Sequence, residues 1–359
     1  RLQGGSDSAS ERYIFTRLST IGERIFSSED SEILDYLDDD GQSVEPRYYI
    51  PALPLVLLNG TSGIGTGWST DIPWFDVDDI IKNLEIMSRM GRKEVFPVHP
   101  NTSSEQNDPD SGELLPIKIG FKGFLGTTTQ TKPGTWEMCG VYEMSLNKKS
   151  IRITELPPGV WTNTYKAWLN KQDWIKDIGD HTTDRKVDLR LTFSEPVIWD
   201  PADKLNLKKS FTTTNMHLFD TEGKIRKYEN PQEILRDWYG NKIKWCATKK
   251  QHLLTKLSEQ MCNASNKLRF IQEVIAGTIG MNRKKTEMEK ELDSKGYDRI
   301  DGGFSYLFDM SMHSITEERI EALKRDIVSL QEDVDLKSRM SPEDFFWDGV
   351  QTISDIIHV

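Results

Sequence analysis

The chain has little cysteine and little histidine for its length. Its 359 residues include three cysteines, Cys139, Cys246 and Cys262, and six histidines. The cysteines form no CxxC pair and the histidines form no HExxH motif, so neither a structural zinc site nor a disulfide framework is expected. Unpaired cysteines are usual in reducing compartments, and we therefore expect the protein to lie in the nucleus or the cytosol.

Long apolar runs are also lacking. The longest, Tyr48 to Leu58, contains Pro51 and Pro54 and is much shorter than the roughly 20 residues that cross a bilayer. The sequence begins RLQGGSDSAS, without Met and without a basic segment followed by an apolar one. We therefore expect a soluble piece of a larger protein, with no membrane partner and no signal peptide.

Positive charge is in the minority, but it is unevenly spread. The chain carries 46 Lys and Arg against 57 Asp and Glu, which gives a net charge of −11. Acidic residues cluster between Ser27 and Asp40, whereas basic residues gather at 204–209 and 223–227. Because whole-chain charge is a weak guide when it is unevenly distributed, the basic segments keep a nucleic-acid partner open.

Glycine is concentrated in one stretch, NGTSGIGTGWST, from Asn59 to Thr70. This stretch lacks the Gly-Lys-Ser/Thr of a phosphate loop, the GxGxxG of a dinucleotide site and the GxSxG of a nucleophile elbow. Glycines permit a positive φ or a close approach of the backbone to a ligand. Two interpretations remain open: a tight turn with Ile64 tucked into the core, or a loop that presses Ile64 against something flat.

The whole chain is long enough for two or three domains. Its first two thirds predict an α+β fold. Asp76 is expected to cap a helix, because apolar residues follow it at helical spacing. Strands are expected at 115–121, 136–146, 151–156, 187–193 and around 216–228. Residues 97–116 are rich in turn-forming residues and predict a loop.

The last third predicts two long helices. Apolar residues recur at alternating spacings of three and four in two segments, which is typical of a coiled coil. These residues are Leu254, Leu257, Met261, Ala264, Leu268, Ile271 and Ile275 in the first segment, and Ile320, Leu323, Ile327, Leu330 and Val334 in the second. We expect an antiparallel stalk, although an ordinary helical hairpin has the same pattern. Its tip carries apolar residues that we expect a second copy of the chain to bury, namely Phe304, Tyr306, Leu307, Phe308 and Met310.

Several stretches together resemble the eukaryotic-type type II DNA topoisomerases, in the C-terminal part of their DNA breakage-reunion core. They are RYIFTRL, EPRYYIPALPLVLLNGTSGIGTGWSTDIP, TELPPGVWTNTY, NMHLFD, FSYLFDM and SPEDFFWDGV, in the family's order. The resemblance implies an α+β, mainly helical chain. Its implied parts are the end of a winged-helix region with the wedge loop at 1–95, an α/β tower domain at 96–230, a first coiled-coil helix at 231–285, a small helical C-gate tip at 286–316, and a second coiled-coil helix returning to the tower at 317–359.

The resemblance also implies roles for individual residues. Tyr13 would attack a DNA phosphodiester and form a 5′-phosphotyrosine, and the guanidinium of Arg12 would contact a phosphate oxygen. Ile64 would insert between base pairs and kink the gate duplex, with Gly63, Gly65 and Thr66 against the DNA. Further DNA contacts are implied for the polar stretch that comprises Lys208, Lys209, Ser210, Thr212, Thr213, Thr214 and Asn215. Ser6 and Glu11 depart from the family's pattern.

The implied partners and cofactors belong to the whole enzyme. A gate duplex and a transported duplex are the expected DNA partners, and the C-gate tip is expected to form a homodimer. Mg²⁺ and ATP are expected to bind modules that lie before this segment, and no metal ligands are expected within it. The nucleus is the expected location, with an organelle or a viral replication site as alternatives.

Two other functions stay open from the residues alone. A non-catalytic DNA-bending protein with coiled-coil dimerisation would keep the wedge without the chemistry. A coiled-coil scaffold would need neither the wedge nor DNA.

Overall fold

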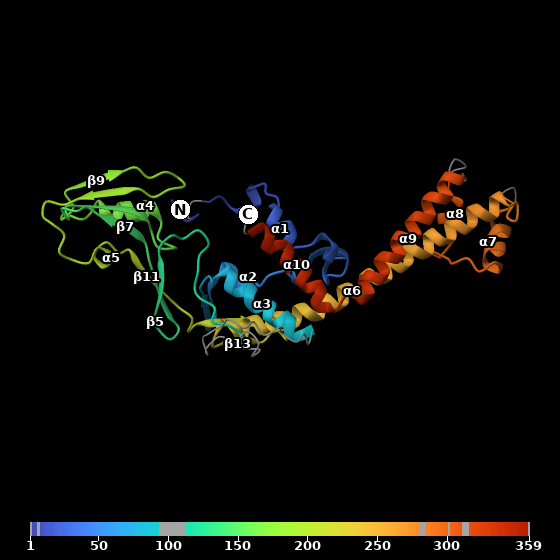
Figure 1. Ribbon diagram of the computed structural model, residues 1–359, viewed down its shortest axis with the longest axis horizontal. Coiled ribbons are helices and arrows are strands. Elements are labelled where there is room, and N and C mark those ends of the chain that lie inside the picture. The colour runs from blue at the N-terminus through green and yellow to red at the C-terminus, as the bar shows by residue number, and fades with distance from the viewer. Residues whose placement is uncertain are drawn as a thin grey trace, which may run out of the picture. The chain divides into compact units, whose positions relative to one another are not determined.

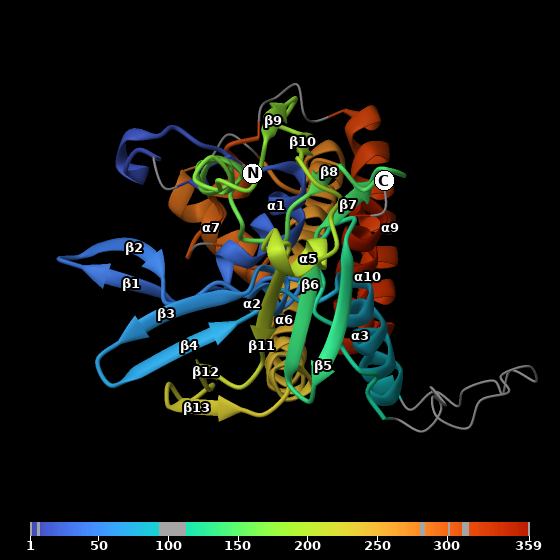
Figure 2. The same ribbon diagram turned by 90° about the vertical axis from the view of Figure 1, so that its left-hand side faces the viewer.

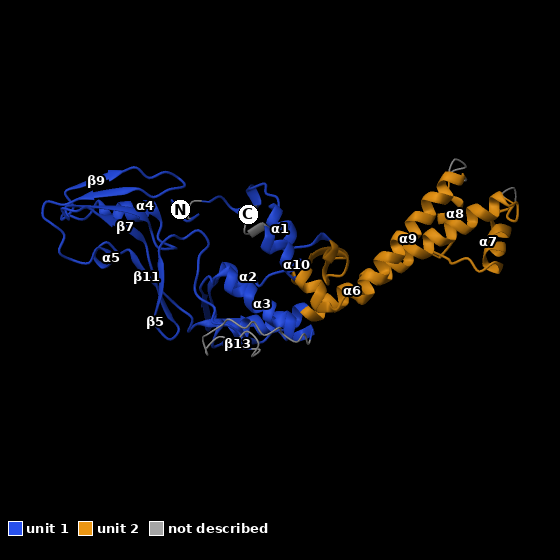
Figure 3. Ribbon diagram, in the orientation of Figure 1, with its two compact units in different colours: residues 1–28, 50–242, 349–359 blue, residues 29–49, 243–348 orange. Residues whose placement is uncertain are grey.

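The computed structural model describes residues 2–5, 8–92, 113–280, 284–300, 302–310 and 316–357. Within them the protein is α+β, as the sequence predicts (Figure 1). It divides into two compact units (Figure 3). Unit 1 comprises Arg1–Ser28, Ile50–Lys242 and Gly349–Val359, and unit 2 comprises Glu29–Tyr49 and Ile243–Asp348. Ser6 and residues 97–112 of the expected loop lie outside the described residues.

Unit 1 holds most of the β-structure, in antiparallel sheets (Figures 1 and 2). Its strands form a four-stranded sheet in the order β7-β8-β10-β9, a three-stranded sheet in the order β11-β6-β5, and the hairpins β3-β4 and β12-β13. The strand bounds are β3 Thr61–Gly65, β4 Trp68–Ile72, β5 Thr127–Lys132, β6 Thr135–Cys139, β7 Val141–Met144, β8 Ser150–Glu155, β9 Asp177–Asp180, β10 Leu189–Thr192, β11 Lys208–Thr212, β12 Met216–Phe219 and β13 Ile225–Tyr228. The helices are the 3-10 turn η1 Glu11–Tyr13, α1 Thr20–Ile25, α2 Leu55–Asn59, α3 Val77–Arg92, α4 Thr162–Leu169 and α5 Pro201–Lys204.

One core of unit 1 lies between the four-stranded sheet and α4. Alternate residues of β8 and β10 face this core, so Ile151, Ile153 and Leu189 are buried. Tyr165 of α4 is buried against them and its hydroxyl donates to the carbonyl of Leu205, 2.6 Å away. The expected strands 151–156 and 187–193 correspond to β8 and β10.

The strand expected over 136–146 is wrong as a single strand. The chain leaves the three-stranded sheet after Cys139 and enters the four-stranded sheet at Val141. The crossing point is Gly140, where a Cβ would stand 2.3 Å from the carbonyl oxygen of Glu155. Only glycine fits there, and the backbone of Gly140 donates to Leu207 at 2.8 Å instead of continuing one ladder.

Two other expectations around α3 have opposite outcomes. The cap is confirmed, because the Asp76 carboxylate accepts from the backbone N–H groups of Asp78 and Asp79, each at 3.1 Å. The strand expected at 115–121 is wrong, since its only ladder contact is an isolated bridge between Ile119 and Phe75.

Unit 2 is mainly helical. Its elements, three of which extend into unit 1, are the 3-10 turn η2 Ser28–Glu32, β1 Tyr36–Asp39, β2 Gln42–Pro46, α6 Pro231–Ile275, α7 Lys285–Ser294, α8 Ser305–Phe308, α9 Glu317–Arg339 and α10 Pro342–Ile357. The ammonium of Lys250 in α6 donates to the carbonyls of Ser338 and Met340 at the end of α9. None of the helices in the described ranges has the length and hydropathy that a membrane crossing requires.

The apolar rows that the sequence predicts are the less exposed rows of both helices. Leu323 is buried, and Ile320, Ile327, Leu330 and Val334 are half-buried between exposed neighbours. In α6 the corresponding residues from Leu254 to Ile271 are half-buried or buried. Ile275 departs from the prediction, because it is the last residue of α6 and is exposed.

The expectation that a second copy must bury the tip is wrong for two of its residues. Phe304 and Leu307 are already buried within this chain, in a cluster that also holds Phe270, Leu292 and Tyr297. Tyr306, Phe308 and Met310 pack against that cluster and remain half-buried. The sequence could not predict this cluster, because α7 folds back onto the end of α6.

Candidate nucleic-acid interface

The glycine-rich stretch forms a β-hairpin, which Figure 2 shows at the edge of unit 1 beside β12-β13. In the register of β3 and β4, Ile64 lies opposite Ser69 and Gly65 lies opposite Trp68. Gly67 takes a φ of 79° in the turn, which a side chain would strain. Ile64 is 93% exposed, so its side chain is not tucked into the core.

The four glycines of the hairpin have different reasons to be glycine. Gly60 has a φ of 65°, and a Cβ there would stand 2.6 Å from the carbonyl oxygen of Ile72. Gly63 and Gly65 have no positive φ, and a Cβ on Gly63 would meet nothing within 4 Å. A Cβ on Gly65 would lie 4.0 Å from its nearest neighbour. The fold therefore does not itself require glycine on either side of Ile64.

The outer edge of β4 is braced by the segment that leads into β12. The backbone N–H of Asp71 donates to the carbonyl of Asn215 at 2.8 Å, and the side-chain amide of Asn215 donates to Ser69 Oγ at 3.0 Å. Asn215 was predicted from sequence as a DNA contact, yet its side chain is used inside the protein. Sequence reasoning missed Ser69 and His217, which complete this bracing, because a glycine-rich loop carried no sign of a strand.

The two lysines of β11 have different surroundings. Lys208 Nζ lies 2.7 Å from Asp203 Oδ1 and 3.2 Å from Asp200 Oδ2, and these carboxylates, Asp203 foremost, raise the pKa of Lys208. Lys209 forms no ion pair with any described residue and lies over the ring of Phe211, with Nζ 5.4 Å from the ring centroid. Lys209 is therefore the lysine whose charge stays available.

The hydroxyl residues of the predicted polar stretch also differ in their exposure. Ser210, Thr214 and the hairpin residue Thr66 are exposed, whereas Thr212 is half-buried. Thr213 is buried, and its backbone N–H donates to the carbonyl of Gly134 at 2.9 Å.

A hollow of about 470 Å³ separates the base of the hairpin from β11. The hairpin and β11 both contribute polar lining groups, and β11 also contributes one basic group. The lining residues are Asn59, Gly60, Thr61, Ser62, Asp71, Ile72, Pro73, Trp74, Lys209, Ser210, Phe211 and Thr212. The ring of Trp74 packs edge-to-face on Phe211 at 5.5 Å and joins the two walls. Of the predicted DNA contacts, Lys209, Ser210 and Thr212 of β11 line this hollow, whereas Ile64 and its flanking glycines lie outside its lining.

Tyr13 and Arg12 lie in the turn η1. Tyr13 is 70% exposed, and the guanidinium of Arg12 lies over its ring, 4.9 Å from the centroid. Across the described residues, no hydrogen bond or ion pair links this pair to the hairpin or to β11. The phenol is thus open to an external reactant, with a cation beside it.

A metal ion is part of the expected chemistry of the resembling enzymes. No group of three or more His, Cys, Asp or Glu side chains that could hold one occurs in the described part of the chain. The described residues therefore do not fit a metal site.

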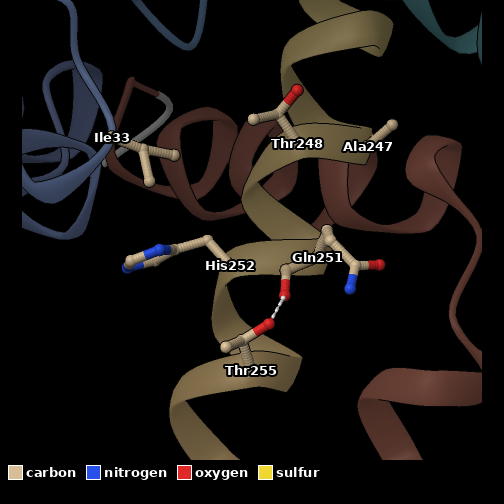
Figure 4. A pocket seen from close by; sticks show the side chains of 6 residues that line it. All are labelled: Ile33, Ala247, Thr248, Gln251, His252 and Thr255. Carbon is tan, nitrogen blue, oxygen red and sulfur yellow. Dashed lines mark hydrogen bonds between the residues drawn. The ribbon is translucent and has the colours of Figure 1, made fainter.

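A second hollow, of about 550 Å³, lies in unit 2 between Ile33 and one face of α6 (Figure 4). Of its six lining residues only His252 is ionisable, and its Nε2 lies 3.0 Å from Glu32 Oε2. Because that contact already engages the imidazole, this hollow offers no free charged group to a ligand.

Comparisons with known proteins agree on one family. The family model for the DNA gyrase/topoisomerase IV A protein matches residues 1–349. The chain is 31% identical to DNA topoisomerase 2 of Penicillium chrysogenum, 35% identical to that of Arabidopsis thaliana and 32% identical to DNA topoisomerase 2-alpha of Homo sapiens. These alignments cover 96%, 83% and 98% of this chain.

The chain spans only 20% to 25% of the length of these relatives. Among solved structures, the DNA-binding, cleavage and re-ligation domain of Plasmodium falciparum topoisomerase II is similar to it, with a TM-score of 0.83 and 28% identity. That match covers 99% of this chain and 51% of the other. The family match, which covers nearly the whole chain, establishes that this protein belongs to the type II DNA topoisomerases, in the family of the DNA gyrase/topoisomerase IV A protein.

Proposed function

We propose that this chain is part of the DNA gate of an ATP-dependent type II topoisomerase, which cuts one duplex, passes a second through the break and reseals the first. The observation that carries the proposal is Ile64, a large aliphatic side chain held 93% exposed at a hairpin that the fold builds around it. An exposed isoleucine between two glycines that the fold does not require is suited to close contact with an external surface.

Double-stranded DNA can provide the surface that Ile64 contacts. Unstacking one base step costs about a few kcal/mol, and burying an isoleucine side chain returns roughly 1.5–3 kcal/mol, so the wedge offsets much of its own cost. The rest is offset by the extra contacts that a bent duplex makes. Gly63 and Gly65 let the backbone approach the groove, because neither carries a side chain that would meet the DNA.

Tyr13 supplies the nucleophile. Its phenol oxygen forms a bond to the phosphorus while the bond from phosphorus to the 3′ oxygen breaks; the phenol loses a proton and the leaving 3′ oxygen gains one. The product is a 5′-phosphotyrosine, and attack of the 3′ hydroxyl reverses the step. Arg12, whose guanidinium lies beside the ring, holds a phosphate oxygen during the transfer.

The DNA backbone lies along the hairpin and β11. Lys209, Ser210, Thr66 and Thr214 are suitable phosphate contacts, because their polar groups are exposed or unpaired. Such contacts position the duplex without reading its sequence. Binding is therefore sequence-tolerant and weakens as salt concentration rises.

The proposal assigns each segment of the chain to a part of the enzyme. Residues 1–95 end the winged-helix region, 96–230 form the tower, 231–285 and 317–359 form the coiled-coil stalk and its return to the tower, and 286–316 form the C-gate tip through which two copies dimerise. The half-buried aromatic residues Tyr306 and Phe308 are the tip side chains still available to a second copy. Two copies supply two tyrosines, one for each DNA strand.

ATP and Mg²⁺ belong to other parts of the complete enzyme in this proposal. The curated relatives are four to five times longer than the matched segment, which leaves room for those modules. Because these relatives come from eukaryotes, whose DNA lies mainly in the nucleus, the nucleus is the proposed location.

The covalent intermediate gives the first test. The full-length protein is incubated with plasmid and the reaction is stopped with denaturant. The natural protein should leave protein joined to 5′ DNA ends, and Tyr13→Phe should leave none, because it lacks the nucleophilic oxygen. A covalent product from the Tyr13→Phe protein would refute the role of Tyr13. If the natural protein yields no product but still bends DNA, it is an architectural protein.

The wedge gives the second test. Ile64→Ala should reduce bending of a duplex, measured as energy transfer between dyes on its ends, more than it reduces affinity. Ile64→Leu, which keeps an aliphatic side chain of the same size, is the matched control. Equal bending by Ile64→Ala and the natural protein would refute the wedge.

A further inference from the structure

The wedge hairpin is held from one side only. β3 pairs with β4, and all five of its residues are exposed. A two-stranded hairpin on its own is marginally stable in water. The direction of Ile64 therefore depends on what supports β4.

That support comes from Asn215 and His217, which flank a buried residue, Met216. Met216 is fully buried, and its neighbours Asn215 and His217 contact β4. Met216 pairs with Tyr228 on β13, and the Tyr228 hydroxyl donates to Asp237 at 2.9 Å in the first turns of α6. The two neighbours are thus anchored to the core of unit 1 through Met216.

Contacts from Asn215 and His217 reach four consecutive residues of β4. The carbonyl of Asn215 accepts from the backbone N–H of Asp71 at 2.8 Å, and the backbone N–H of His217 donates to Thr70 Oγ1 at 3.2 Å. The Asn215 side chain reaches Ser69 at 3.0 Å. The imidazole of His217 meets the ring of Trp68 edge-to-face, with centroids 5.6 Å apart.

The two side chains also hold each other. Because the amide nitrogen of Asn215 donates to Ser69, its Oδ1 faces His217 and accepts from Nδ1 at 2.9 Å. Ser69 is the cross-strand partner of Ile64. The chain of hydrogen bonds from His217 through Asn215 therefore ends directly opposite the wedge residue.

We infer that Asn215 and His217 are positioning residues, which hold β4 so that Ile64 meets the duplex at the angle that bends it. The inference rests on the proposed function, and it assigns the Asn215 side chain to the hairpin rather than to the DNA contact expected from the sequence. Binding itself depends on the phosphate contacts, so the loss of this support separates bending from affinity.

The experiment measures bending and affinity in the full-length protein with the same end-labelled duplex. Asn215→Ala, Ser69→Ala and His217→Val should each lower the ratio of bent to straight complexes about fivefold, as expected for one net hydrogen bond. Affinity should change by less than about threefold. Ser69→Thr keeps the hydroxyl and should restore bending. Phe219→Ala, on the same strand but exposed, is the matched control.

Non-additivity provides the decisive comparison. Ser69→Ala added to Asn215→Ala should cost no more than Asn215→Ala alone, because the hydrogen bond between the two side chains is already lost. Full additivity, or normal bending by the Asn215 and His217 variants, would overturn the inference. The wedge itself would still stand if Ile64→Ala fails to bend DNA. If Asn215→Ala instead lowers affinity by more than about threefold while Ser69→Ala does not, Asn215 contacts DNA directly and the positioning role is wrong. Normal bending by Ile64→Ala would refute the wedge, on which the proposed function itself rests.

Discussion

Lys208 and Asp203 form an ion pair, with 2.7 Å between Nζ and Oδ1, next to a lysine that has no acidic partner in the described residues. Asp200 also contacts Lys208, at 3.2 Å. Two adjacent basic residues of one strand are therefore not equivalent. Counting basic residues in the sequence cannot separate them, since the acids that neutralise Lys208 lie in and before the short helix α5.

The difference predicts unequal salt effects. Lys209→Ala should reduce the slope of log affinity against log salt concentration by about 0.9, the value for one lost phosphate contact. Lys208→Ala should change the slope by less than half as much. Duplex binding by the full-length protein, measured by fluorescence anisotropy over a range of salt concentrations, checks this, with Lys209→Arg as the charge-preserving control. Equal slopes for both alanine variants would contradict the assignment.

The hairpin glycines predict a separation of folding from DNA binding. Gly60→Ala should lower the free energy of unfolding by about 1–2 kcal/mol or more, because its φ is 65° and its Cβ would clash with a carbonyl oxygen. Gly63→Ala should leave thermal stability unchanged and should impair duplex bending. Thermal melts and the end-to-end energy-transfer assay measure the two effects. A destabilised Gly63→Ala protein would show that the strand needs this glycine for itself.

The buried hydroxyl of Tyr165 predicts a stability effect. Tyr165→Phe leaves the carbonyl of Leu205 without its donor in the core of unit 1, so unfolding should become easier by about 1–3 kcal/mol. A melting temperature lower by several degrees is the expected readout. The same substitution at the exposed Tyr13 is the control and should leave the melting temperature unchanged.

The pair Arg152–Asp188 predicts a dependence on acid. The guanidinium of Arg152 donates to both oxygens of Asp188, at 2.9 and 2.7 Å, and this hydrogen bonding lowers the pKa of Asp188 to about 2. A lowered pKa means that the stabilisation is complete above the unfolded value near 4 and is lost as the pH falls towards 2. Asp188→Asn should therefore be less stable than the natural protein at pH 7, and the difference should vanish near pH 2.

Urea midpoints at pH 7, 4 and 2 measure that difference. Asp184→Asn, an exposed aspartate in the preceding loop, is the control and should show no such change. A gap between Asp188→Asn and the natural protein that stays constant with pH would contradict the argument.

Sequence periodicity predicted the parts of the fold that local chemistry decides. Asp76 caps α3, and the apolar row from Ile320 to Val334 is the less exposed face of α9. The switch between sheets at Gly140 was not predicted, because its cause is the carbonyl of Glu155, which only the folded chain brings near. Tertiary contacts of this kind leave no periodic signal.

The candidate site was predictable in composition but not in function. From the residues alone a core position for Ile64 remained open, and only the family resemblance implied that this side chain is exposed. The different surroundings of Lys208 and Lys209, and the internal use of Asn215, depend on Asp203 and Ser69, which lie elsewhere in the chain. The motif identifies which segments meet, whereas the contacts decide which side chains stay available.

The attachment of Glu32 to α6 has a consequence for synthesis on the ribosome. Lys256 donates to both carboxylate oxygens of Glu32, at 2.6 and 2.7 Å, across a separation of 224 residues. Glu32 emerges before its partner, which leaves the exit tunnel only after most of unit 1 has been made. The segment from Glu29 to Tyr49 must therefore wait, unanchored, while later strands assemble, and a nascent chain stalled before α6 should be cut by proteases there first.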